Sequence, residues 1–194
     1  MKRIVAVCLL SALSCPSFAA LKEGDLAPRF SAPASLDGKE FPFSLDGALK
    51  KGPVVVYFYP SAFTRGCNLQ AHTFSTKADK FAAAGAMVIG VSLDKIATLN
   101  KFSADPEYCA GKVAVASDAG GKIARSYDLQ IKEAAPGMVD SRGTTIDHGF
   151  AERTTFVIDR DGRIVATIGG VQPVQNVEKA LEIVQGLSAK HGGK

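Results

Sequence analysis

Residues 60–67 (PSAFTRGC) place a thiol and a hydroxyl between a predicted strand and a predicted helix. We expect Cys67 in the first helical turn, where the helix dipole and unpaired N–H groups favour a thiolate. Free thiols have pKa values of about 8.5, which helix N-termini or adjacent cations lower to about 3.5–7.5. Thr64 is placed to cap this helix and to donate its hydroxyl toward the sulfur, and Pro60 forms the turn out of the strand without adding a donor. Cys67 is therefore a candidate nucleophile, and the alternative is an inert, buried cysteine.

Strands and helices alternate around this segment. Residues 54–59 (VVVYFY) are a β-branched and aromatic run between two prolines, typical of a strand buried on both faces. A helical pattern follows over residues 67–84 and ends at Gly85. Further strands are predicted at 87–93, 113–116, 154–158 and 164–168, and further helices at 96–102, 123–127 and 177–187. This order predicts an α/β fold in which helices flank a central mixed β-sheet.

Residues 130–150 do not fit this alternation. They contain Pro136 and three glycines, which predict a long surface loop of the kind that is functional or mobile. His148 lies in this loop and His191 near the C-terminus, and we expect solvent to surround both side chains.

The first twenty residues have the pattern of a secretory signal peptide. Lys2 and Arg3 precede an apolar run over residues 4–13, and Ser17 and Ala19 offer small side chains at the −3 and −1 positions of a cleavage site. The run is shorter than the roughly 18 residues of a membrane span, so we expect no such span. The alternatives are a buried N-terminal element or lipidation at Cys15. We therefore predict a periplasmic or secreted protein.

The predicted domains are a signal peptide over residues 1–20, one globular domain over residues 21–188 and a flexible tail over residues 189–194. The chain has 194 residues, 46% of them hydrophobic, which suits a single domain. Its net charge of +4 falls to +2 without the two basic residues of the signal peptide, which disfavours nucleic-acid binding.

Cys67 and Cys109 are the only thiols left after cleavage, in a compartment where disulfides form. No Cys-x-x-Cys pair or ligand cluster is present, so we expect neither a metal nor a cofactor.

The pattern Pro60-x-x-x-Thr64-x-x-Cys67 resembles the active-site signature of the peroxiredoxins, which are thiol-dependent peroxidases. Residues 24–30 (GDLAPRF) are similar to the family's opening motif, and residues 153–159 (RTTFVID) to the late strand that begins with its active-site arginine. The resemblance covers about residues 21–185. It is strongest to the bacterioferritin-comigratory, or Q-type, branch, in which a glycine precedes the cysteine and a glutamine follows three residues later.

The resemblance implies a thioredoxin-like fold and reduction of hydrogen peroxide and organic hydroperoxides. Cys67 would attack a peroxide oxygen and become a sulfenic acid. Thr64, Arg153 and backbone N–H groups at the helix start would stabilise the negative charge of the transition state. The alternative for Arg153 is a surface residue paired with Glu152. A thioredoxin-like protein or another thiol would be the reductant, and the protein would be a monomer or a homodimer.

The sequence departs from the branch at His72, where many Q-type members carry the resolving cysteine. Cys109 is then our candidate resolving cysteine, because other members place this thiol in the later helical region. The alternative is that Cys109 is structural and that an external thiol resolves the sulfenic acid. We interpret His72 as an ordinary helix residue rather than a metal ligand or base.

Two other function classes remain open. One is a thiol–disulfide oxidoreductase or redox-assembly protein on the same fold, but Gln70 and Ala71 stand where its second cysteine would be. The other is a redox-insensitive binding module, in which Cys67 would react with peroxide no faster than free cysteine.

Overall fold

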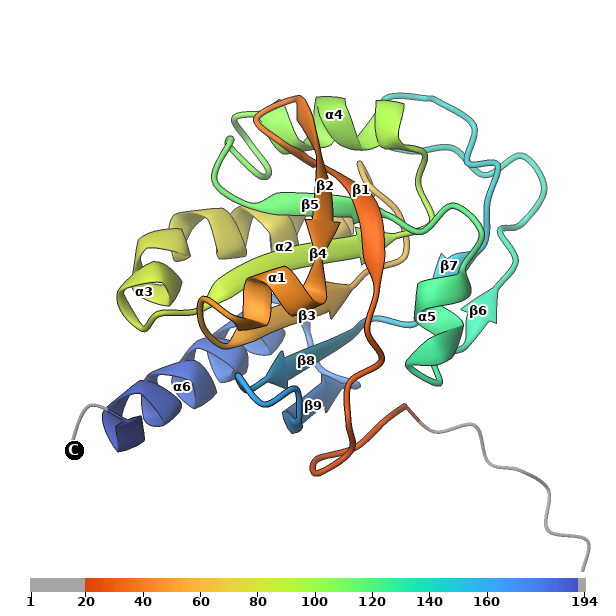
Figure 1. Cartoon of the computed structure of the whole chain (residues 1–194). Coiled ribbons are helices and arrows are strands. Elements are labelled where there is room, and N and C mark those ends of the chain that lie inside the picture. The colour runs from red at the N-terminus through yellow and green to blue at the C-terminus, as the bar shows by residue number, and fades with distance from the viewer. Residues whose placement is uncertain (1–19, 192–194) are drawn as a thin grey trace, which may run out of the picture.

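The computed structural model describes residues 20–191, and helices cover both faces of its seven-stranded β-sheet (Figure 1). The strand order in this sheet is β2-β1-β5-β4-β3-β8-β9, and β6 and β7 form a separate two-stranded sheet. The strands are β1 (Ser31–Leu36), β2 (Lys39–Ser44), β3 (Val54–Phe58), β4 (Met87–Ser92), β5 (Ala114–Ser117), β6 (Ile131–Lys132), β7 (Phe150–Ala151), β8 (Thr154–Ile158) and β9 (Ile164–Gly169). The helices are α1 (Leu45–Leu49), α2 (Arg65–Thr76), α3 (Ala78–Ala83), α4 (Ile96–Ala104), α5 (Lys122–Ser126) and α6 (Pro173–His191).

The central strand β3 confirms the prediction of a strand buried on both faces. All five of its residues are buried, and it pairs with β4 in parallel and with β8 antiparallel, so the sheet is mixed as expected. Val55 and Tyr57 point into one core, and the alternate residues, such as Val56, point into the other. Figure 1 shows α1 and α2 on opposite sides of these central strands.

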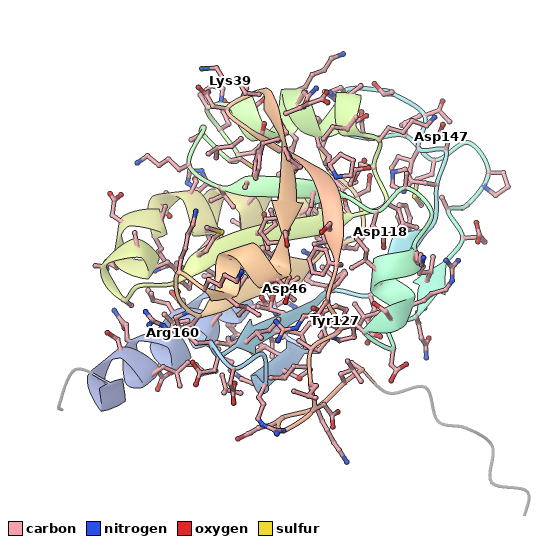
Figure 2. The ribbon with its side chains drawn as sticks, in the orientation of Figure 1. Lys39, Asp46, Asp118, Tyr127, Asp147 and Arg160 are labelled. Atoms are coloured by element: carbon pink, nitrogen blue, oxygen red, sulfur yellow. The ribbon has the colours of Figure 1, made fainter. Side chains whose placement is uncertain are left out.

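Each face of the sheet has its own apolar core. One core lies under α1 and α5 and includes Tyr127, which Figure 2 shows beside α5 and whose hydroxyl donates to the Pro28 carbonyl at 3.0 Å. The other core lies under α2, α3, α4 and α6 and contains both described cysteines, Cys67 and Cys109. The chemistry predicted from the sequence therefore belongs to the second core.

The helix predicted over residues 67–84 is two helices, α2 and α3, separated at Lys77. Hydroxyl side chains in the last turns of α2 donate back to main-chain carbonyls of the same helix. Thr73 donates to the Leu69 carbonyl at 2.7 Å, and Thr76 donates to the Thr73 carbonyl at 3.0 Å. The break leaves α2 as a separate element.

The hairpin of β1 and β2 was not predicted, because Pro33 and Pro42 interrupt both strand patterns. These prolines lie opposite each other in the antiparallel register. Asp37 and Gly38 join the strands with φ values of 52° and 72°, a turn that Asp-Gly pairs favour. The signal in the sequence was therefore the turn rather than the strands.

Residues 130–150 form a surface segment with more order than a plain loop. β6 and β7 pair at its two ends, and an isolated bridge joins Val139 to Thr145. No helix among residues 20–191 combines the length and the apolarity needed to cross a membrane.

The predicted N-terminal segment lies outside the described residues apart from Ala20, and with it Cys15. At the other end, α6 continues to His191, so the first three residues of the expected tail are helical. Residues 192–194 lie outside the described part of the chain.

Candidate active site

Cys67 lies in the first turn of α2, and the loop of residues 59–64 connects this helix to β3. Thr64 is the N-cap residue, and the Cys67 N–H donates to the Thr64 carbonyl at 2.9 Å. The Cys67 side chain is only 2% exposed. The sulfur therefore combines a helix N-terminus with a site that excludes most water, which strengthens its interaction with any nearby charge.

Arg153 supplies that charge from the neighbouring strand. β8 runs antiparallel to β3 with Thr154 opposite Phe58, so the residue before β8 lies where β3 leads into residues 59–64, the active-site loop. The Arg153 Nη2 donates to the Cys67 Sγ at 3.2 Å. The arginine expected from the sequence thus lies next to the sulfur. Its guanidinium bonds to Cys67 and Gln70 rather than pairing with Glu152.

Gly66 leaves room for this guanidinium. A Cβ atom at Gly66 would lie 3.2 Å from the Arg153 Nη2 and 3.8 Å from the Pro173 Cγ. That approach is tight, so a side chain here would require the Arg153 guanidinium to shift by a few tenths of an ångström. The glycine before the cysteine therefore has a steric reason in this structure.

Gln70 contacts the other arm of the same guanidinium. The Arg153 Nη1 donates to the Gln70 Oε1, and the Gln70 Nε2 donates to the Asn176 Oδ1 at 3.0 Å. In the sequence Gln70 was only a mark of the Q-type branch, and Asn176 gave no signal. Nothing in the sequence places Asn176, 106 residues away on α6, beside Gln70.

The prediction that the Thr64 side chain caps α2 is wrong, although Thr64 does occupy the N-cap position. Its hydroxyl donates to the Ser61 carbonyl at 2.8 Å and accepts no bond from the helix N–H groups. This short turn keeps the hydroxyl inside the active-site loop and leaves the first N–H groups of α2 without a side-chain cap from Thr64.

Asp94 holds the active-site loop from the end of β4. Its buried carboxylate accepts from the Ala62 N–H at 2.8 Å and from the hydroxyls of Ser92 and Ser61 at 2.7 Å and 3.3 Å. Asp94 therefore fixes the loop that leads into Cys67.

His148 also contacts Asp94, which contradicts the expectation that solvent surrounds it. Its Nε2 lies 3.1 Å from the Asp94 Oδ1, and its Nδ1 lies 2.8 Å from the Gly149 carbonyl. Both neighbours only accept hydrogen bonds, so a protonated imidazole satisfies both. Burial alone would lower the pKa of His148, but these two acceptors raise it above the ordinary value.

Phe63 joins the 130–150 segment to the active-site loop. It adopts a φ of 56°, which is strained for a bulky residue, and its carbonyl accepts from the Ser141 N–H at 2.8 Å. The Arg142 guanidinium lies over its ring, 3.3 Å from the centroid. The segment therefore packs on the loop instead of projecting freely into solvent.

Cys109 lies in the same core as Cys67, and both are free thiols. Cys109 is fully buried, and burial followed by the charge of Asp105 raises the pKa of its thiol. His72 on α2 bonds through Nδ1 to the Glu107 carbonyl at 2.9 Å, so the segment that carries Cys109 is attached to α2. His72, which stands where many Q-type members carry the resolving cysteine, thus contacts the segment that carries Cys109.

A cavity of about 590 Å³ lies beside the guanidinium and the active-site proline. Pro60 and Arg153 line one side of it, and Lys132, Phe150 and Ala151 from the small sheet line another. Within residues 20–191 no group of three or more acidic, histidine or cysteine side chains is arranged to hold a metal ion.

Comparison with known proteins places this arrangement in a family. Residues 24–167 match the AhpC/TSA family. The peroxiredoxin Bcp of Escherichia coli is 33% identical over 144 residues, which cover 74% of this chain and 83% of that protein. The chloroplastic peroxiredoxin Q of Suaeda salsa is 31% identical over 172 residues, which cover 87% of this chain and 70% of that protein.

Solved structures agree. The peroxidoxin BcpB of Mycobacterium tuberculosis superposes with a TM-score of 0.71 at 30% identity, covering 86% of this chain and 98% of its own. The bacterioferritin comigratory protein of Xanthomonas campestris has a TM-score of 0.63 at 25% identity, covering 80% of this chain and 91% of its own. The thioredoxin-like fold is confirmed, and the chain belongs to the AhpC/TSA family as a peroxiredoxin of the Q/Bcp type, a thiol-dependent peroxidase.

Proposed function

We propose that Cys67 is the peroxidatic nucleophile, and the observation that carries this proposal is the Arg153 Nη2 at 3.2 Å from its buried Sγ. The Cys67 thiolate attacks one peroxide oxygen, forming an S–O bond while the O–O bond breaks. The sulfur is oxidised to a sulfenic acid, and the second oxygen leaves with a proton as water or as an alcohol.

The transition state of this step spreads negative charge over sulfur and both oxygens. The Arg153 guanidinium already faces the sulfur and can donate to the attacked oxygen without reorganisation. The Thr64 hydroxyl exchanges its Ser61 acceptor for a peroxide oxygen, a rotation about one side-chain bond.

We further propose that the substrates are hydrogen peroxide and organic hydroperoxides. The cavity beside Pro60 and Arg153 supports the organic class, because Phe150 and Ala151 offer an apolar wall within reach of the guanidinium. The Xanthomonas campestris relative is itself described for alkyl peroxide reduction activity.

For the second step we propose Cys109 as the resolving cysteine. Its thiol displaces hydroxide from the Cys67 sulfenic acid, forming a disulfide and water, and a thioredoxin-type dithiol then reduces that disulfide by exchange. A disulfide needs Cα atoms within about 7 Å of each other, and both thiols are buried, so we propose that local opening of the two segments precedes this step. The His72 bond to Glu107 keeps the two segments adjacent as they open.

Single-turnover oxidation tests both cysteines. Reduced protein is mixed with one equivalent of hydrogen peroxide, and peroxide loss and protein mass are followed. Cys67→Ser should lose rapid consumption, whereas the matched variant Cys109→Ser should retain it and accumulate a sulfenic or overoxidised Cys67. Unchanged consumption by Cys67→Ser would exclude the nucleophile, and a wild type without a Cys67–Cys109 bridge would exclude the resolving role.

We also propose export to the periplasm or the medium, on the signal-peptide pattern of residues 1–20. N-terminal sequencing of protein from the periplasmic fraction should begin near residue 20 or 21. A lipid-modified Cys15 as the first residue would instead support the lipoprotein alternative, and an intact Met1 in the cytoplasm would exclude export.

A further inference from the structure

Asn176, on the first half of α6, connects four elements of the fold. It is 1% exposed, so its amide must find all its partners inside the protein. Its Oδ1 accepts from the Gln70 Nε2 at 3.0 Å and from the Thr155 hydroxyl at 2.5 Å. Its Nδ2 donates to the Ile168 carbonyl at 3.0 Å.

These contacts determine which way the Asn176 amide points. The Ile168 carbonyl is a main-chain acceptor with no donor of its own, so only the Nδ2 can face it. The Oδ1 must then face Gln70, and this selects the Nε2 end of the Gln70 amide as its partner. A reversed Gln70 amide would place its oxygen against the Asn176 oxygen. Two acceptors would then face each other in a buried site, which is unfavourable because neither can donate to the other.

The orientation of Gln70 in turn decides what Arg153 meets. With its Nε2 held by Asn176, Gln70 presents its Oε1 to the Arg153 Nη1. The guanidinium is planar and rigid, so anchoring Nη1 also directs Nη2, which reaches the Cys67 Sγ. Without Asn176, the Gln70 amide loses the contact that fixes its position, and its Oε1 no longer holds the Arg153 Nη1 in one place.

We propose that Asn176 is a positioning residue for peroxide reduction, acting through Gln70 to aim Arg153 at Cys67. This inference rests on the proposed role of Cys67 as the nucleophile. Asn176 itself touches neither the sulfur nor the substrate. Its influence passes through hydrogen-bond polarity, from a main-chain carbonyl on β9 to a guanidinium before β8.

A double-mutant cycle tests this pathway on the full-length protein. The rate constant for Cys67 oxidation by hydrogen peroxide is measured for wild type, Asn176→Leu, Gln70→Leu and the double variant. We expect Asn176→Leu to lower the rate about tenfold in the wild type, a fraction of the effect of losing a direct transition-state donor. In the Gln70→Leu background the same substitution should change the rate by less than about twofold.

Thr155→Val is the matched control. It removes one hydrogen bond from the same Asn176 oxygen but leaves the contacts with Gln70 and Ile168. It should lower the melting temperature, as Asn176→Leu does, while keeping the oxidation rate within about twofold of wild type. A rate loss in Thr155→Val equal to that in Asn176→Leu would reduce Asn176 to a purely structural role and overturn the proposal.

Asn176→Ala provides a second variant if Asn176→Leu does not fold. It also removes the oxygen that accepts from Gln70, so this variant should oxidise about tenfold more slowly than the wild type. A wild-type rate in a folded Asn176→Ala, or equal losses in both backgrounds of the cycle, would contradict the proposal. A wild type that oxidises no faster than Cys67→Ser would instead show that the nucleophile is wrongly assigned. Failure of the proposed function can therefore be told apart from failure of the positioning role of Asn176.

Discussion

The Nη2 of Arg153 and the Sγ of Cys67 lie 3.2 Å apart, although 86 positions separate the two residues in the chain. The antiparallel pairing of β3 with β8 creates this contact. Phe58 ends β3 opposite Thr154, which begins β8, so the segments that carry Cys67 and Arg153 meet at the same end of the two strands. The sulfur is nearly buried, so the charge of the guanidinium acts on it with little screening by water.

Arg153→Lys should lower the rate of Cys67 oxidation about 100-fold while the fold is retained. An ammonium group is one point charge and cannot contact Gln70 and the sulfur together, as the planar guanidinium does. Stopped-flow measurements with hydrogen peroxide give the rate. Arg160→Lys, at the turn beyond the other end of β8, is the control and should oxidise like the wild type; equal rates in both variants would contradict the prediction.

Gly66→Ala should slow Cys67 oxidation about tenfold, because the added methyl group would sit 3.2 Å from the Arg153 Nη2. Gly186→Ala on α6 is the control, since its Cβ would meet no atom within 4 Å. The control should gain about 0.5–1 kcal/mol in unfolding free energy from helix propensity, with no change in rate. An unchanged rate in Gly66→Ala would mean that Arg153 moves aside without consequence.

Tyr57→Phe should leave the protein as stable as the wild type or stabilise it by about 1 kcal/mol. The Tyr57 hydroxyl is buried without a hydrogen-bond partner, and burial, followed by the charges of Cys109 and Cys67, raises its pKa. Tyr127→Phe is the contrasting variant, because it loses the bond to the Pro28 carbonyl and should cost about 1 kcal/mol. Urea unfolding compares the two, and a larger loss in Tyr57→Phe would show that its hydroxyl has a partner.

His148 should stabilise the fold more at low pH than at high pH. Its pKa is raised in the folded protein, so its contribution is complete below the unfolded value of about 6.5 and is lost as pH rises through the folded value. Asp94 faces the imidazole directly, while the exposed Asp147, labelled in Figure 2, pairs with Lys95 at 2.5 Å. The wild-type advantage in melting temperature over His148→Gln should therefore shrink between about pH 5 and pH 9. An advantage that grows over this range would contradict the assignment.

Local patterns in the sequence determined the central elements and the candidate nucleophile. The strands around Val55 and Phe156 are short runs of β-branched and aromatic residues, and such runs are recognisable because their whole length is buried. The position of Cys67 after a strand and at a helix start is also a local property. The family signature then supplied the candidate role of Arg153, which no local pattern indicates.

Tertiary structure decided which polar groups meet. The His148 contact with Asp94 and the amide chain through Asn176 both depend on groups that different elements bring together. A hydrogen bond depends on distances of a few tenths of an ångström, whereas a sequence pattern reports only burial and period along one element. The sequence alone therefore determined that Cys67 is placed to react, and the packing of α2, β8 and α6 decided what surrounds it.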